Sequence, residues 1–175
     1  MITTTLNRIR AYKPCADGWA KLLEGLGKTQ PDDEPLLYAE ILRINGLDGA
    51  LWATRAEPEY AKEWRLFAVW CARRAQHLMK DPRSLAALDV AERYAHGEAT
   101  DSDLRAAGDA AWDAALDNAS AAAWGTALDN ASAAAWGTTR GPAWVTAQAA
   151  SGATARDAER EAQTAEFLRV VGGAK

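Results

Sequence analysis

A long amphipathic pattern in the middle of the chain most restricts its fold. From Pro58 to Met79, apolar residues recur every three or four positions, which places them on one stripe of a helix. Pro58 suits the first helical turn, and the acidic residues on either side of it favour the positive end of the helix dipole. The pattern predicts one helix over 58–79. Its core-facing stripe is expected to be Tyr60, Trp64, Phe67, Cys71, Ala75 and Leu78.

Turn chemistry after this pattern predicts two further helices. Asp81 is expected to cap a helix that starts at Pro82 and ends at Gly97, so that residues 58–97 form a helical hairpin. Its inward residues are expected to be Leu85, Leu88 and Ala95. Another helix is expected from Thr100, where Thr-Asp-Ser-Asp has the spacing of a capping box.

Residues 6–54 predict short helices separated by turns. Asp17 is placed to cap a helix that begins at Gly18 and ends at Gly25. Residues 36–44 have apolar positions at helical spacing, and Asn45-Gly46 is expected to end that helix.

An alanine- and tryptophan-rich segment follows, within which residues 115–126 recur letter for letter as residues 127–138. Alanine favours helix, but a twelve-residue repeat turns each copy by about 120° on a straight helix. Trp112, Trp124 and Trp136 would then point to three sides, so either one long helix or several short ones fits the sequence. A break is expected near 139–142, with a last helix from Pro142 to Val171. A recent duplication of DNA would leave the same repeat without any function.

These elements predict an all-α protein with a single domain over residues 1–175. Short, irregular N-terminal helices over 6–54 pack on longer helices over 58–97 and 100–171, which include the Ala/Trp-rich segment. No run of residues has the alternation of a strand.

Composition excludes several classes of protein. Two cysteines and two histidines are too few for a disulfide scaffold, a zinc finger or an iron–sulfur protein. The first residues lack the apolar stretch of a signal peptide, and no window is apolar enough to cross a membrane. We therefore expect a cytoplasmic protein without a membrane partner, in which Cys15 and Cys71 are reduced thiols.

The net charge of −4 arises entirely in residues 101–140, where six aspartates outnumber two arginines. A chain without a basic cluster at either end is a poor candidate for general nucleic-acid binding. Asp113, Asp117 and Asp129 could instead face a basic partner, although the solvated side of a helix explains the same residues.

A basic stripe lies opposite the apolar stripe of residues 58–79, and we treat it as the first candidate binding site. Its members are Lys62, Arg65, Arg73, His77 and Lys80, with Trp70 and Arg74 beside them. On the helix surface only Glu59 is near enough to offset this charge. Such a stripe could hold a phosphate and stack a base, or contact a protein. The alternative is a solvated polar face.

The usual arrangements of catalytic residues do not fit this sequence. Cys71 and His77 lie six positions apart, on different sides of one helix, so they cannot form a thiolate–imidazole pair within it. The sequence predicts no catalytic residues, no metal site and no cofactor.

Three short motifs resemble a known group of proteins. They are Cys15-Ala16-Asp17-Gly18-Trp19, Cys71-Ala72-Arg73-Arg74 and Ala91-Glu92-Arg93-Tyr94-Ala95-His96-Gly97-Glu98-Ala99-Thr100. With the Ala/Trp-rich segment they span residues 6–138, and the chain resembles alanine/tryptophan-rich proteins described as immunity proteins of bacterial and phage genomes. Its Trp-Gly-Thr units and Gly141-Pro142 depart from the usual tail of that group. The resemblance implies a non-catalytic cytosolic protein that neutralises a toxin or a defence component.

We therefore expect a non-catalytic protein that neutralises a partner, in immunity or counter-defence, by occupying the partner's surface. Three alternatives stay open. The first is a sponge that sequesters a small anionic nucleotide through Trp70, Arg73, Arg74 and His77. The second is an acidic nucleic-acid mimic that blocks a defence complex such as CRISPR, and the third is an enzyme whose site is assembled from distant residues. Exposed tryptophans would also suit a homo-oligomer.

Overall fold

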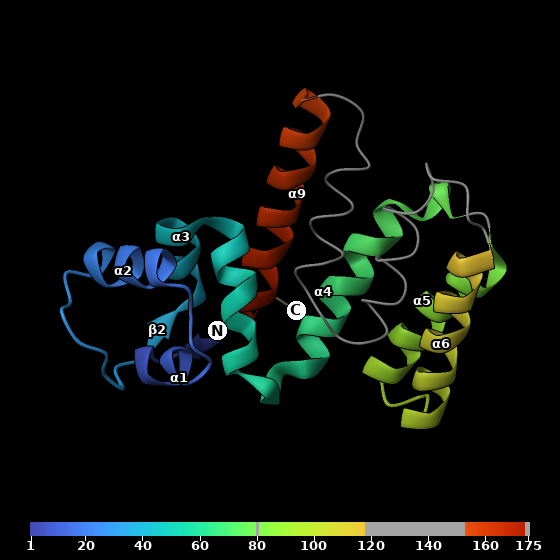
Figure 1. Ribbon diagram of the computed structural model, residues 1–175, viewed down its shortest axis with the longest axis horizontal. Coiled ribbons are helices and arrows are strands. Elements are labelled where there is room, and N and C mark those ends of the chain that lie inside the picture. Colours follow the sequence, from blue (N-terminus) through green and yellow to red (C-terminus); the bar gives the residue numbers. More distant parts are fainter. Residues whose placement is uncertain (80, 118–152, 174–175) are drawn as a thin grey trace. The chain divides into compact units, whose positions relative to one another are not determined.

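Over the residues that the structure describes, the protein is helical apart from two very short strands (Figure 1). The computed structural model describes residues 1–79, 81–117 and 153–173, and over these the predicted all-α fold is confirmed. Contacts divide the chain into two compact units, which we call unit 1 (Met1–Glu59 and Glu166–Lys175) and unit 2 (Tyr60–Ala165). That the whole chain forms one domain stays a prediction, and each unit is described by itself.

Unit 1 joins short helices to a two-stranded sheet. In chain order it contains β1 (Thr3–Thr4), α1 (Leu6–Ala11), α2 (Ala16–Gly25), β2 (Leu36–Leu37), α3 (Tyr38–Ala53) and η1, a 3₁₀ turn (Thr54–Ala56). The strands are antiparallel, with Thr3 opposite Leu37 and Thr4 opposite Leu36. Strands of two residues are too short to produce an alternating sequence pattern, which is why the sequence did not predict them.

Two helix boundaries in unit 1 differ from those expected. Cys15, not Asp17, is the N-cap of α2, and Asp17 lies in the first turn, where its charge still favours the helix dipole. The helix expected over 36–44 begins later, at Tyr38, because Leu36–Leu37 form β2. It ends at Asn45-Gly46 as expected: Gly46 has non-helical dihedral angles (φ 72°, ψ 179°), a conformation that costs a glycine little, and a second helical segment of α3 follows this kink and ends at Ala53.

The end of α9 (Ala153–Gly172) completes the core of unit 1. Phe167 is fully buried and lies edge-on to Tyr38, with the ring centroids 6.1 Å apart. The backbone N–H of Ile2 donates to the carbonyl of Val171 at 2.7 Å. Both ends of the described chain therefore belong to the same unit.

Unit 2 does not contain the single helix expected over 58–79. The 3₁₀ turn η2 (Pro58–Tyr60) precedes α4 (Ala61–Arg74), and the 3₁₀ turn η3 (Gln76–Leu78) follows it. Ala75 separates α4 from η3, with its N–H bonded to the carbonyl of Ala72, the tighter hydrogen-bond pattern common at helix ends. Four residues of the expected apolar stripe, Trp64, Phe67, Cys71 and Ala75, are buried, and Tyr60 is half-buried. The Leu78 side chain lies outside the described residues.

The next two helices, α5 (Pro82–Ala95) and α6 (Asp101–Asp117), start at the two predicted N-caps. The Asp81 carboxylate accepts from the N–H of Arg83 at 2.9 Å. Thr100 and Asp103 exchange bonds as a capping box, with the Thr100 N–H donating to Asp103 at 2.9 Å and the Asp103 N–H donating to the Thr100 hydroxyl at 3.2 Å. No helix in the described ranges is long and apolar enough to cross a membrane.

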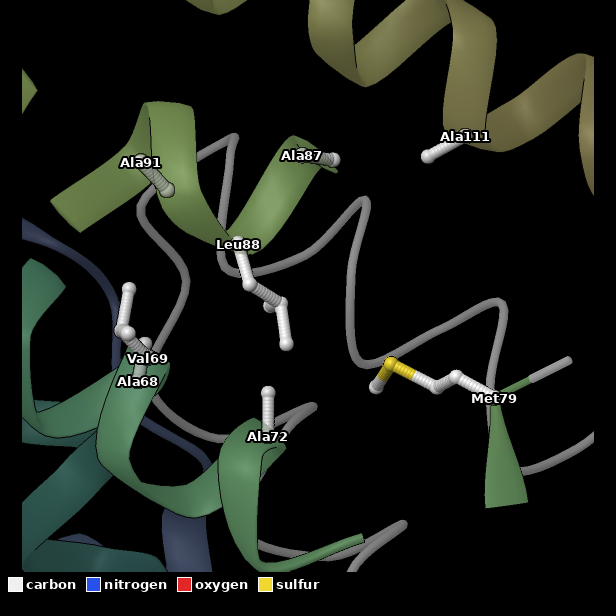
Figure 2. Close-up of a cluster of buried hydrophobic side chains, with 8 residues drawn as sticks. All are labelled: Ala68, Val69, Ala72, Met79, Ala87, Leu88, Ala91 and Ala111. Atoms are coloured by element: carbon white, nitrogen blue, oxygen red, sulfur yellow. The ribbon is translucent and has the colours of Figure 1, made fainter. Parts of the chain in front are cut away.

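Small side chains dominate the core shared by α4, α5 and α6 (Figure 2). Its members are Ala68, Val69, Ala72, Met79, Ala87, Leu88, Ala91 and Ala111. Alanines let the helix backbones approach closely, and Leu88 extends from α5 into the space beside α4 (Figure 2). Leu88 and Ala95 face inward as expected, but Leu85 is 36% exposed, and the inward positions are taken by Ser84, Ala87 and Ala91.

The repeat beyond Asp117, its tryptophans Trp124 and Trp136, and the break expected at 139–142 lie outside the described residues. Of the last helix expected over 142–171, the described part is α9, which begins at Ala153 and ends at Gly172.

Candidate functional site

The basic stripe of α4 is balanced by carboxylates from other helices. Arg73 lies 2.7 Å from both Asp89 and Glu92 of α5. The Arg74 guanidinium lies 2.7 Å from Glu159 of α9, a carboxylate that is almost fully buried. The sequence expectation that only Glu59 offsets this charge is therefore wrong. The compensating residues are too distant along the chain for the pattern of one helix to reveal them.

Aromatic rings cover two of the stripe's guanidiniums. Arg74 lies 4.9 Å from the centroid of Trp70, and Trp70 in turn stacks on Phe67. Arg65 lies 4.8 Å from the ring of Tyr94, whose hydroxyl donates to Asp101 at 2.6 Å. Burial lowers the pKa of Arg65, while the hydrogen bond to Asp101 raises the pKa of Tyr94. Arg65, Trp70 and Arg74 thus help to hold unit 2 together.

The remaining members of the stripe are placed differently. Lys62 and His77 are exposed, and Lys80 lies outside the described residues. His77 is on the surface while Cys71 is buried, consistent with the expectation that they do not pair. Both cysteines are free thiols, and in the described ranges no three histidine, cysteine or acidic side chains are grouped closely enough to hold a metal ion.

A second surface lies on α6 and contains an exposed tryptophan. We call it the α6 outer face and define it as Arg105, Asp109, Trp112 and Asp113, all exposed and all within one side of the helix. Ala111 and Ala114 are buried on the opposite side, and Trp112 is 47% exposed. Of the other predicted acidic contacts, Asp117 is the last residue of α6 and Asp129 lies outside the described residues.

The sequence left the direction of Trp112 open, because the spacing of the tryptophans predicts only that successive rings point to different sides. The capping box at Thr100 is the sequence signal that bears on this direction, because it sets the start of α6. Given that start, the buried alanines Ala111 and Ala114 show which side of α6 faces inward and that Trp112 faces outward.

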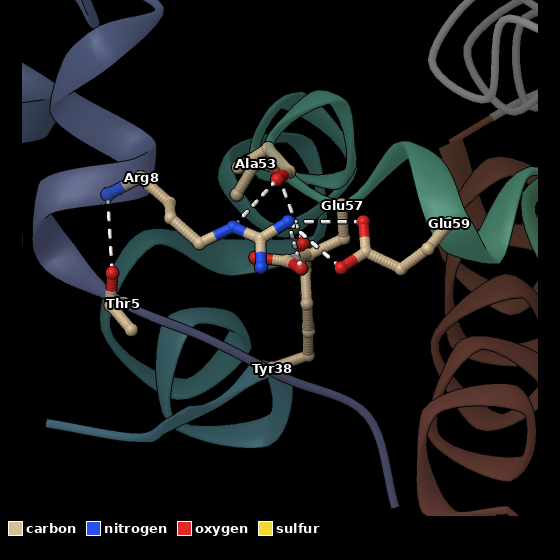
Figure 3. Close-up of polar contacts among 7 residues, drawn as sticks. Thr5, Arg8, Tyr38, Ala53, Glu57 and Glu59 are labelled. Atoms are coloured by element: carbon tan, nitrogen blue, oxygen red, sulfur yellow. Dashed lines mark hydrogen bonds and ion pairs between the residues drawn. The ribbon is translucent and has the colours of Figure 1, made fainter. Parts of the chain in front are cut away.

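A third cluster, in unit 1, joins residues far apart in the sequence (Figure 3). The Nη2 atom of Arg8 in α1 lies 2.8 Å from carboxylate oxygens of both Glu57 and Glu59, and its Nε donates to the carbonyl of Ala56 at 3.1 Å. The Glu57 side chain is 1% exposed. Tyr38 contributes a hydroxyl that donates to the carbonyl of Ala53. Arg8 therefore ties α1 to the segment that follows η1.

Burial and charge act in opposite directions on the acids of this cluster. Burial raises the pKa of Glu57, against the lowering effects of the Thr4 hydroxyl and of Arg8. Its own backbone N–H and the Arg8 guanidinium lower the pKa of Glu59. Burial raises the pKa of Tyr38, so this phenol stays protonated.

We expect Arg8→Met to destabilise the protein more at pH 8 than at pH 4. Because folding raises the pKa of Glu57, the protonated carboxyl stabilises the folded state at low pH. This stabilisation is lost as pH rises through the pKa of Glu57 in the folded protein. Removing Arg8 raises that pKa further. Glu59 has a lowered pKa, so its contribution exists at high pH, and the variant loses it there. Because Arg8 is 45% exposed, we expect a cost of only about 1–2 kcal/mol at pH 8.

Urea denaturation at both pH values measures this difference. Arg43→Met is the matched control, because Arg43 forms an exposed pair with Glu40 in its own helix turn. An equal cost of Arg8→Met at pH 4 and pH 8 would contradict the assignment.

Comparisons with known proteins add no identification. No protein-family model matches the chain, and no curated protein or solved structure is significantly similar to it. The resemblance to immunity proteins therefore stays a prediction.

Proposed function

We infer that this chain is a non-catalytic binding protein that neutralises a partner by occupying the partner's surface. The observation that supports this function is the exposure of Trp112 beside the charged residues of the α6 outer face. An indole is a large apolar group that gains free energy when a partner buries it. Tryptophans surrounded by polar residues are typical energetic centres of protein interfaces.

The setting of this function is proposed from the sequence. The motifs that resemble immunity proteins of bacteria and phages suggest a toxin or a defence component as the partner, in immunity or counter-defence. A surface inhibitor needs shape and a few anchoring side chains, and it needs no activated nucleophile. The α6 outer face meets that requirement.

The nucleotide sponge receives less support from the geometry of α4. It assigns the anion to Arg73 and Arg74, and both guanidiniums already contact carboxylates within 2.7 Å. A phosphate would have to displace those carboxylates. Trp70, which was to stack on the base, already contacts Phe67 and Arg74.

Native mass spectrometry tests the proposal. The tagged full chain is recovered from the cells that encode it and then denatured to identify anything retained. We expect a stoichiometric protein partner, and we expect Trp112→Ala to lose it while Leu85→Ala, which shortens an exposed apolar residue of α5, retains it. A retained small anion would favour the sponge, and a chain recovered bare would contradict the binding function.

The basic stripe needs its own variant. Reversing Arg73 or Arg74 would place a glutamate beside Asp89, Glu92 or Glu159 and would disturb the fold. Lys62→Glu combined with His77→Glu changes two exposed residues. Loss of the partner with this pair, but not with Trp112→Ala, would move the contact from α6 to α4.

A further inference from the structure

We propose that the α6 outer face binds a cationic protein surface, one in which lysine or arginine side chains surround an apolar pocket for Trp112. This proposal rests on the proposed function and names the chemistry of the partner at that site. Three independent features of the face support it: the excess of its negative charges, their position along the helix, and the exposed ring of Trp112 beside them.

The α6 outer face contains more negative than positive charge, since Asp109 and Asp113 share it with Arg105. Asp109 and Asp113 are one helical turn apart, a spacing at which like charges repel. Within the described ranges no ion pair involves either of them. Other acidic surface residues do have cationic neighbours, as Glu40 has Arg43 and Glu34 has Lys28. Among the described residues, this face therefore has a net negative charge that complements a cationic surface.

The position of these charges along α6 also disfavours the isolated helix. Asp101 and Asp103 lie in the first turn, where the dipole stabilises anions. Asp109 and Asp113 lie beyond that turn and gain nothing from it, and the last described turn contains no basic residue. A cationic partner would remove this repulsion, so the arrangement is better suited to the bound state than to the free one.

Trp112 lies beside Asp109 on this surface, because it follows Asp109 by three residues, and Asp113 follows Asp109 by four. Tryptophan is the aromatic ring that attracts cations most strongly, so a lysine or arginine can contact the ring and a carboxylate at once. The exposed acids of α9 lack this combination. Asp157 and Glu161 are also one turn apart, but Arg156 and Arg160 precede them and no tryptophan lies among them.

The experiment uses the complex recovered for native mass spectrometry. A carbodiimide, which joins a carboxylate directly to a lysine amine, is added, and the linked peptides are sequenced. We expect links from Asp109 or Asp113 to lysines of the partner. We also expect the complex to dissociate as salt is raised, because exposed charges are screened.

Variants with a matched control complete the test. Asp109→Asn with Asp113→Asn should weaken the complex by about tenfold or more, mainly at low salt, whereas Asp157→Asn with Glu161→Gln should change it by less than about twofold. Both pairs remove the same charge from an exposed helix face. The first pair should leave the melting temperature unchanged or raise it, which separates lost binding from lost folding.

The outcomes distinguish the proposed cationic partner surface from the proposed binding function on which it rests. If no partner is retained, both fail. If a partner is retained but the Asp109/Asp113 variant and the control variant bind it equally well, the proposal of a cationic surface is wrong. It is also wrong if the partner surface is acidic or the partner is a second copy of this chain. In each of these cases the proposed binding function stands.

Discussion

Leu88→Ala is expected to lower the free energy of unfolding by about 2–5 kcal/mol. Leu88 is fully buried in a core whose other members are mostly alanines (Figure 2). When it is shortened, the neighbouring methyl groups are too small to move into the space, so the cavity persists and adds to the loss of buried apolar surface. That loss would be a large part of the total stability of a protein this size.

Leu85→Ala is the matched control, because it removes the same atoms from the same helix at a position that is 36% exposed. We expect it to cost less than about 1 kcal/mol. Urea denaturation followed by circular dichroism measures both variants. Equal effects of the two substitutions would show that the assignment of the inward side of α5 is wrong.

Phe167→Ala is expected to cost about 3–5 kcal/mol. The ring is fully buried and lies edge-on to Tyr38, a contact that adds to the free energy gained by burying its area. Loss of the ring should destabilise parts of unit 1 that are distant from residue 167 in sequence, because Phe167 contacts Tyr38 at the start of α3. Hydrogen exchange should then show faster opening of α1 and α3.

Leu168→Ala provides the comparison at the next position of α9, where the side chain is 41% exposed. We expect it to cost less than about 1 kcal/mol and to leave exchange in α1 and α3 unchanged. Unchanged exchange after Phe167→Ala would contradict the assignment of the end of α9 to unit 1.

Local signals predicted those parts of the fold that depend on neighbouring residues. Asp81 and Thr100 start their helices as expected because a cap involves only the adjacent turn. The buried stripe of α4 is also visible in sequence. Leu85 was misplaced because Leu85 and Leu88 both fit a helical period, and only the packing of α4 and α6 against α5 decides between them.

The candidate site depended more on residues distant in sequence. The sequence could show that Arg73 and Arg74 share a helix face, but not that α5 and α9 supply the carboxylates opposite them. In the same way, the pairing of Arg8 with Glu57 and Glu59 joins positions about fifty residues apart. Trp112 became a candidate only when the burial of Ala111 and Ala114 fixed its direction.

Because unit 1 combines residues 1–59 with residues 166–175, a ribosome must make all of residues 60–165 before unit 1 can be completed. At ordinary rates of translation, Phe167 and Val171 follow residue 59 by a delay on the order of ten seconds. During this time Ile2 and Tyr38 lack part of their native cover, so these apolar side chains of the nascent chain are open to chaperones and proteases.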